Sequence, residues 1–180
     1  MTTILALDLS GRTGFARWRE GSDHIASGAV GIGRESAGQT FATFRDWLND
    51  QLIGNGVDRL VIEAAFVSIK TVSSAPRLYG LAAICDELAY RRRIRPPERV
   101  APAAWRRFFL GCAMAPKTVA AKHRRAWLKA ESMAKCRSLG MEPKTDDESD
   151  AIGVLFYERA RLFPAYGVQG DLGLLPPRST

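Results

Sequence analysis

The chain has 180 residues, of which 46% are hydrophobic, a composition sufficient for the core of one globular domain. Its formal net charge of +7 favours a polyanionic partner, because lysine and arginine release the counterions condensed on phosphates. No apolar run approaches the roughly 20 residues that span a bilayer, and three scattered cysteines with only two histidines argue against a zinc site. An odd cysteine count without an apolar signal segment predicts a soluble protein of the reducing cytoplasm.

Hydrophobic periodicity and turn residues divide the chain into strands and helices. The expected strands span residues 3–9, 13–19, 24–32, 59–63 and 94–101. The first expected helix begins at Ser36 or Thr40 and ends at 54–56. The other expected helices span 74–92, 102–112, 117–135 and 147–162. This order predicts an α/β domain over residues 1–163: a mixed five-stranded sheet, with an antiparallel meander joined to parallel strands and helices on its faces. Residues 164–180 are rich in glycine and proline and are predicted to form a flexible tail.

Four carboxylates lie where charge is costly. Asp8 closes the apolar run 4–7, and Glu63 closes the run 60–62. Asp147 and Asp150 begin the expected helix 147–162, directly before its apolar stretch, and share one helical face. Clustered carboxylates repel one another, and magnesium prefers oxygen ligands, so the pattern predicts a metal-dependent nuclease.

Each carboxylate also has a structural interpretation when it is considered alone. Asp8 fits a turn former before Ser10, Glu63 fits an ion-pair partner, and the acidic start at 146–150 fits a solvated first helical turn. The joint pattern is more specific than any of its parts.

Over residues 3–160 these motifs resemble the RuvC-type Holliday junction resolvases of the RNase H-like superfamily. The segment 4–16 is similar to the family's opening strand and turn, and 60–63 to the strand that ends in the catalytic glutamate. Asp147-Glu148-Ser149-Asp150-Ala151 keeps the family's Asp-x-x-Asp-Ala form. The resemblance implies that Asp8, Glu63, Asp147 and Asp150 hold two Mg²⁺ ions, with Mn²⁺ as a substitute, and that Lys117 lies at the rim of the active site.

The sequence departs from the family at three positions. Leu9 and Ser10 replace the usual proline and glycine, a form associated with phage-like members. Asp146 adds an acidic neighbour, so either Asp146 or Asp147 fits the third ligand position. The resemblance also implies a homodimer, with 78–82 in a helix that contributes to its interface.

Basic residues and one phenylalanine are candidates for contact with nucleic acid. Those predicted to contact it are Arg12, Phe66, Lys70, Lys122, Arg124 and Arg125. Phe66 fits a base-stacking residue at a branch point, although a phenylalanine after a buried strand is more often part of the core. A second arginine-rich segment spans 91–99. The aromatic residues Trp105, Phe108, Phe109 and Trp127 have helical spacing and are predicted to pack.

The sequence favours a crossover junction endodeoxyribonuclease that cleaves branched DNA by two-metal-ion hydrolysis. One alternative keeps the chemistry and changes the substrate to RNA, an RNA–DNA hybrid or a flap. Two others are a sugar-kinase or actin-like nucleotide-binding fold, which lacks support because no second Asp-Gly phosphate loop follows, and a catalytically inactive nucleic-acid-binding module.

Overall fold

A five-stranded mixed sheet forms the centre of the protein. The computed structural model describes residues 1–33, 36–64 and 75–166. The strand order is β3-β2-β1-β4-β5, with β1 antiparallel to β2, β2 antiparallel to β3, and parallel pairs β1/β4 and β4/β5. The strands are β1 (Thr3–Asp8), β2 (Arg12–Arg19), β3 (Ile25–Gly31), β4 (Arg59–Glu63) and β5 (Glu98–Val100). The predicted meander with added parallel strands is confirmed.

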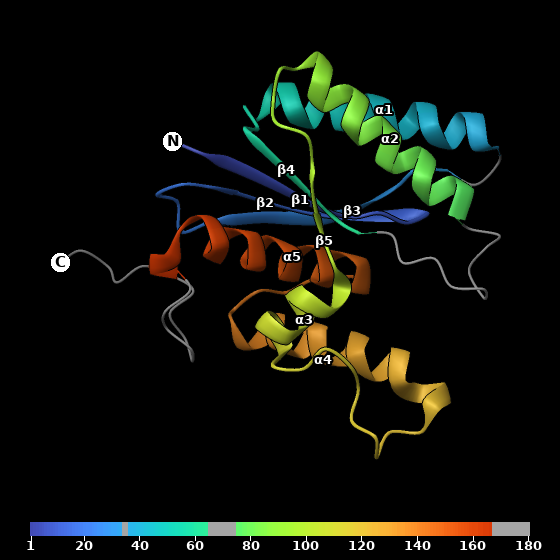
Figure 1. Cartoon of the computed structure of the whole chain (residues 1–180), viewed down its shortest axis with the longest axis vertical. Coiled ribbons are helices and arrows are strands. Elements are labelled where there is room, and N and C mark those ends of the chain that lie inside the picture. The colour runs from blue at the N-terminus through green and yellow to red at the C-terminus, as the bar shows by residue number, and fades with distance from the viewer. Residues whose placement is uncertain (34–35, 65–74, 167–180) are drawn as a thin grey trace.

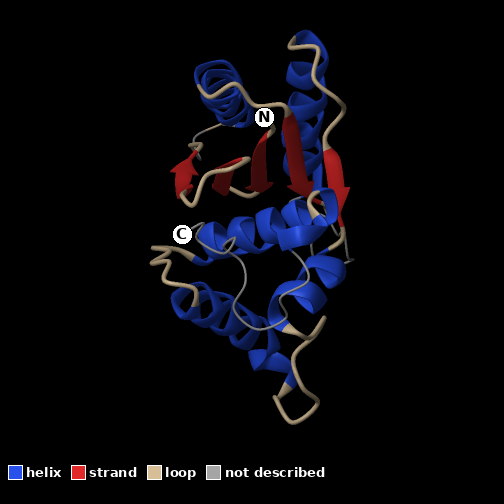
Figure 2. Cartoon of the chain, turned by 90° about the vertical axis from the view of Figure 1, so that its left-hand side faces the viewer, coloured by secondary structure: helices blue, strands red, loops and turns tan. Residues whose placement is uncertain are grey.

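Helices cover both faces of this sheet (Figure 1). They are α1 (Ala37–Gly54), α2 (Ala75–Arg91), α3 (Pro102–Leu110), α4 (Arg124–Ser138) and α5 (Asp146–Leu162), with short 3₁₀ turns η2 (Ala121–His123) and η3 (Pro164–Tyr166). Figure 2 shows α1 and α2 on one face, α5 directly against the other, and α3 and α4 beyond α5. No helix in the described ranges is both long and apolar enough to cross a membrane.

Side-chain alternation along the strands produces two cores. In β1, Ile4 and Ala6 join the core beneath α5, whereas Leu5 and Leu7 join the core beneath α1 and α2. The same alternation in β4 places Val61 on the α5 side. Because both faces are covered, these strands are continuously apolar until each one ends in a carboxylate.

Most element boundaries agree with the sequence to within a residue or two. Ser36 caps α1 by accepting the Gln39 N–H, whereas Thr40 is buried inside the helix. The predicted strand 94–101 shortens to β5, because Pro96 and Pro97 have no N–H to give to a sheet. The basic segment predicted to be helical from Lys117 begins instead with a turn closed by Val119 N–H on the Pro116 carbonyl.

The predicted boundary between domain and tail is only partly within the described residues. Phe163 packs edge-on against Trp18 with ring centroids 5.5 Å apart, and η3 follows it. The remainder of the predicted tail, 167–180, lies outside the described residues, as do Phe66 and Lys70. The division at residue 163 therefore stays a prediction.

Candidate active site

Strand register brings the first two carboxylates together. Leu7 pairs with Ile62 in the parallel β1/β4 ladder, so Asp8 and Glu63 follow on neighbouring strands. Asp8 continues the parity of Ile4 and Ala6, and Glu63 that of Val61, so both side chains project from the face covered by α5. Two carboxylates on adjacent strands of one face repel each other.

The N-terminus of α5 supplies the other two carboxylates. Thr145 caps this helix by accepting the Glu148 N–H at 3.1 Å, and the buried Glu148 reaches back to accept the Lys144 N–H at 2.8 Å. Helical spacing then places Asp147 and Asp150 on the same face. Figure 1 shows that α5 begins at the end of the sheet where β1 and β4 finish.

Two contacts hold the start of α5 against the meander. Ser27 of β3 donates its hydroxyl to Glu148 Oε1 at 2.7 Å. Gly14 of β2, directly opposite Asp8 in the register, lies so close to α5 that a Cβ would come within 1.9 Å of the Asp147 carbonyl oxygen. The hydrogen bond from Ser27 to Glu148 and the lack of a side chain at Gly14 therefore allow the acidic end of α5 to lie beside Asp8.

Burial and mutual repulsion raise pKa values within this group of carboxylates. Burial raises the pKa of Asp8 well above its usual value, and Glu63, Asp150 and Asp147 raise it further, in that order. Burial also raises the pKa of Glu63, and it raises that of Asp150 to about 6. Because all three carboxylates act on Asp8, the four side chains form one electrostatic unit.

The raised pKa of Asp150 predicts a measurable pH dependence. Well below pH 3.8 the carboxyl is protonated in both the folded and the unfolded chain, whereas between its ordinary pKa of 3.8 and about 6 only the folded chain keeps most of the proton. We therefore expect the free energy of unfolding of the metal-free protein to fall as the pH rises through this window. The contribution from Asp150 is on the order of 3 kcal/mol.

Chemical denaturation from pH 4 to 8, with and without Asp150→Asn, measures this contribution. We expect the free energy of unfolding to fall less steeply with rising pH in the variant than in the wild type. Equal slopes for the two proteins would contradict the contribution assigned to Asp150.

Arg106 of α3 places a positive charge beside two of these carboxylates. Its Nη2 lies 3.9 Å from Glu63 Oε2 and 4.0 Å from Asp150 Oδ2. Its charge lowers the pKa of both carboxyls and of Asp8 against the larger effect of burial. The sequence alone does not single out Arg106, because it is one of many arginines and only the position of α3 after β5 distinguishes it.

The structure separates the neighbouring candidates. Asp146 forms an ion pair with Lys129 of α4, whereas Asp147 acts on Asp8, so the electrostatics favour Asp147 as the third carboxylate. Lys117 is exposed in the loop between α3 and η2 and forms no ion pair with the carboxylates in the described parts of the chain. Its role at the rim stays a prediction.

Trp105 does more than pack. It is fully buried, as predicted, but its indole Nε1 also donates to Glu63 Oε2 at 2.6 Å. Phe109 stacks on Phe156 of α5, and Phe108 is 40% exposed beside Tyr157.

Four of the six candidate DNA contacts lie within the described residues. Arg12 begins β2 just after the Asp8 strand, and Lys122, Arg124 and Arg125 are exposed where α4 begins. Figure 1 shows that α4 and α5 begin at the same end of the molecule.

The second arginine-rich segment is partly neutralised. Arg91 pairs with Glu87, and Arg99 with Asp86. The start of the segment follows the end of α2, toward the other end of the sheet (Figure 1). Its last residue, Arg99, lies in β5 and pairs with Ile62, one position before Glu63.

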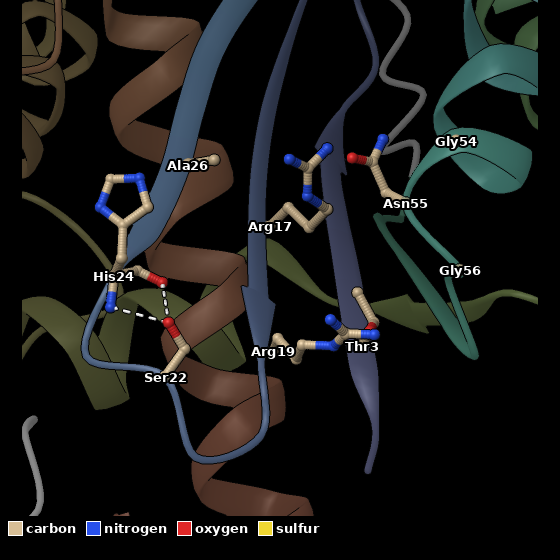
Figure 3. A pocket seen from close by; sticks show the side chains of 9 residues that line it. All are labelled: Thr3, Arg17, Arg19, Ser22, His24, Ala26, Gly54, Asn55 and Gly56. Carbon is tan, nitrogen blue, oxygen red and sulfur yellow. Dashed lines mark hydrogen bonds between the residues drawn. The ribbon is translucent and has the colours of Figure 1, made fainter.

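A hollow of about 410 Å³ lies where α1 ends, over the start of β1 and the end of β2 (Figure 3). Arg17 within it donates to Gln51 Oε1 at 3.0 Å, beside Asn55 at the end of α1. It is lined by Thr3, Arg17, Arg19, Ser22, His24, Ala26, Gly54, Asn55 and Gly56, and thus contains none of the four carboxylates.

The carboxylate cluster has the donor chemistry of a magnesium site. Glu63, Asp150 and Asp147 all repel the charge on Asp8, and a hard cation bound among these oxygen ligands would offset that repulsion. As the side chains stand in residues 1–33, 36–64 and 75–166, no three acidic, histidine or cysteine groups already surround one point. Arg106 provides the positive charge between Glu63 and Asp150 in this arrangement.

No protein-family model matches the chain, and no curated protein sequence matches it. Among solved structures, Thermus thermophilus RuvC superposes with a TM-score of 0.66 at 15% identity, covering 89% of this chain and 96% of that one. T. thermophilus RuvC in complex with a Holliday junction substrate gives 0.66 at 13% identity, covering 91% and 97%. The yeast mitochondrial Holliday junction resolvase gives 0.55 at 11% identity, covering 93% and 84%. The chain therefore has a RuvC-like fold.

Proposed function

We propose that this protein is a metal-dependent endonuclease that resolves branched DNA, with the four-way junction as its substrate. The convergence of Asp8, Glu63, Asp147 and Asp150 at one end of a RuvC-like sheet carries the proposal. One structural neighbour was solved with a Holliday junction substrate, and the basic chain suits a polyanion.

The chemistry follows from the donor set. The four carboxylates would hold two Mg²⁺ ions, or Mn²⁺ in their place. When bound, these ions would lower the pKa of the attacking water and neutralise charge on the phosphate. Arg106 lies within reach of the same centre and would stabilise the additional negative charge of the transition state. Lys122, Arg124 and Arg125 would contact phosphates of the DNA and set its position without reading its sequence.

A symmetric junction calls for two active sites. We propose a homodimer whose two centres nick strands related by the twofold axis. The α2 helix is the candidate interface: Tyr79 on it is 56% exposed.

Cleavage of a synthetic four-way junction tests the function. We expect paired symmetric nicks with Mg²⁺ or Mn²⁺ and none with EDTA. Matched linear duplex, flap and RNA–DNA hybrid substrates serve as comparisons. Cleavage confined to the hybrid or flap would keep the nuclease and change its substrate. Metal-dependent cleavage of none of them, with junction binding retained, would indicate a binding module.

Replacing Arg106 tests its electrostatic role. We expect Arg106→Gln to lower the cleavage rate about 10²-fold, because a donor directed at developing charge typically contributes that much. The exposed Arg107 next to it provides the control, since Arg107→Gln changes the net charge equally. Single-turnover rates for both variants measure the effect. Equal rates for the two would contradict a specific role for Arg106.

A further inference from the structure

We propose that Trp105 is a positioning residue of the cleavage centre, holding Glu63 through its indole N–H and supporting Arg106 on its ring. The inference rests on the proposed metal-dependent function. It assigns a role in that centre to a side chain whose sequence pattern indicates only packing.

The hydrogen bond to Glu63 is the first observation. Trp105 Nε1 lies 2.6 Å from Glu63 Oε2, and the tryptophan is fully buried. A buried N–H bonded to a carboxylate is a charge-assisted hydrogen bond, stronger than one between neutral groups. The indole N–H holds Glu63 Oε2, while Glu63 Oε1 forms no hydrogen bond within the described parts of the chain. Glu63 is thereby restricted to one orientation, with Oε1 left for a metal ion.

The second observation concerns Arg106. Its guanidinium carbon lies 5.1 Å from the centre of the Trp105 ring, a cation–π distance. The same guanidinium lies 3.9 Å from the Glu63 oxygen to which the indole donates. One side chain therefore contacts both the glutamate and the arginine of the centre.

Backbone connections explain how Trp105 reaches this place. Val100 of β5 pairs with Glu63 in the sheet, and α3 begins at Pro102, directly after that strand. Pro102 suits the first helical turn, where its missing N–H costs nothing. Trp105 is one turn further on, which returns its indole toward Glu63.

The opposite helix leaves room for the ring. A Cβ on Gly153 of α5 would lie 2.5 Å from Trp105 Cζ3 and 3.1 Å from Phe109 Cδ1. Gly153 is in the middle of a helix, where glycine lowers stability relative to alanine. This small residue lets the indole lie between α5 and the sheet, close enough to reach the carboxylate.

Trp105→Phe tests the role of the N–H, because phenylalanine keeps an aromatic ring and removes the donor. Trp18 provides a matched control: it is 1% exposed, donates its indole N–H to the Ser22 carbonyl at 2.8 Å, and has the Arg159 guanidinium 5.3 Å from its ring centre. Ser22 belongs to the turn after β2, away from the carboxylates. Trp18→Phe therefore also removes a buried indole hydrogen bond, to a neutral carbonyl and outside the centre.

The first readout is Mn²⁺ binding to the full chain, measured by titration calorimetry without DNA. We expect Trp105→Phe to weaken binding about 10- to 100-fold, the usual effect of losing a partner that orients a metal ligand, and Trp18→Phe to change it less than twofold. The rate constant for junction cleavage should fall with Trp105→Phe while the KM stays unchanged. Thermal unfolding of both variants separates these effects from stability.

Each outcome is decisive. Unchanged Mn²⁺ affinity in Trp105→Phe would overturn the positioning role and leave the tryptophan as a packing residue. If the wild-type chain bound no Mn²⁺ and cleaved no substrate, the proposed function would fail first, and the role of Trp105 with it.

A second measurement serves if Trp105→Phe does not fold. The indole N–H signals of the wild-type protein are recorded by NMR during Mg²⁺ titration, assigned by replacing Trp18, Trp47 and Trp127 in turn. We expect the Trp105 signal to shift with the midpoint of Mg²⁺ binding and the Trp18 signal to stay in place. A Trp105 signal that stays in place while Mg²⁺ binds would overturn the proposal.

Discussion

Asp8→Asn is expected to lower junction cleavage by about 10³-fold or more, while the metal-free protein becomes more stable. Asp8 has all three other carboxylates acting on it, so a metal ion bound there would lose a central ligand. Several kcal/mol of transition-state stabilisation correspond to this loss of rate. Removal of the same charge relieves repulsion from Glu63, Asp147 and Asp150, which raises the melting temperature in EDTA at pH 8.

Cleavage rates and thermal unfolding with and without Mg²⁺ test both effects. We expect Mg²⁺ to raise the melting temperature of the wild type and to have little effect on Asp8→Asn. Asp23→Asn serves as control, because Asp23 is exposed in the turn between β2 and β3. A variant that keeps cleavage within tenfold of wild type would remove Asp8 from the centre.

Gly14→Ala is expected to have the second large effect. Its Cβ would lie 1.9 Å from the Asp147 carbonyl oxygen and 2.3 Å from the carbonyl carbon. Backbone on both sides must move apart, at a cost of about 1–3 kcal/mol or more. Since Gly14 pairs with Asp8, this movement carries Asp147 and Asp150 away from Asp8, and misplacement by about 1 Å reduces the rate about 10²-fold.

Denaturant unfolding and single-turnover cleavage measure the two consequences. Gly31→Ala is the control in the same sheet, because a Cβ on Gly31 would meet nothing within 4 Å. We expect Gly31→Ala to leave the cleavage rate unchanged. Equal effects of the two substitutions would show that the close approach of α5 to β2 has no bearing on activity.

The sequence predicted the fold well, because its strongest signals are local. Apolar runs that end in Asp8 and Glu63 indicate two buried strands, and strand parity fixes which face each carboxylate takes. Ser36 before an amphipathic run marks the start of α1. Such signals depend only on residues near one another in the chain.

The remaining parts of the site depend on contacts between distant segments. Trp105 and Arg106 read as members of a short aromatic and basic helix, and only the pairing of β5 with β4, directly before α3, brings them to Glu63. Glu148 reads as one more acidic residue in a first helical turn, although its partner is Ser27 of β3. No local pattern encodes these pairings.

The order of the elements along the chain has a consequence during synthesis. Asp8 and Glu63 leave the ribosome well before α5, which contributes Asp147 and Asp150. Translation exposes the chain from its N-terminus, so a partly made protein displays two of the four carboxylates and lacks the helix that covers that face of the sheet. A nascent chain thus lacks half of the acidic cluster until α5 is made, and if the proposed function holds, it would be unable to nick DNA before α5 docks.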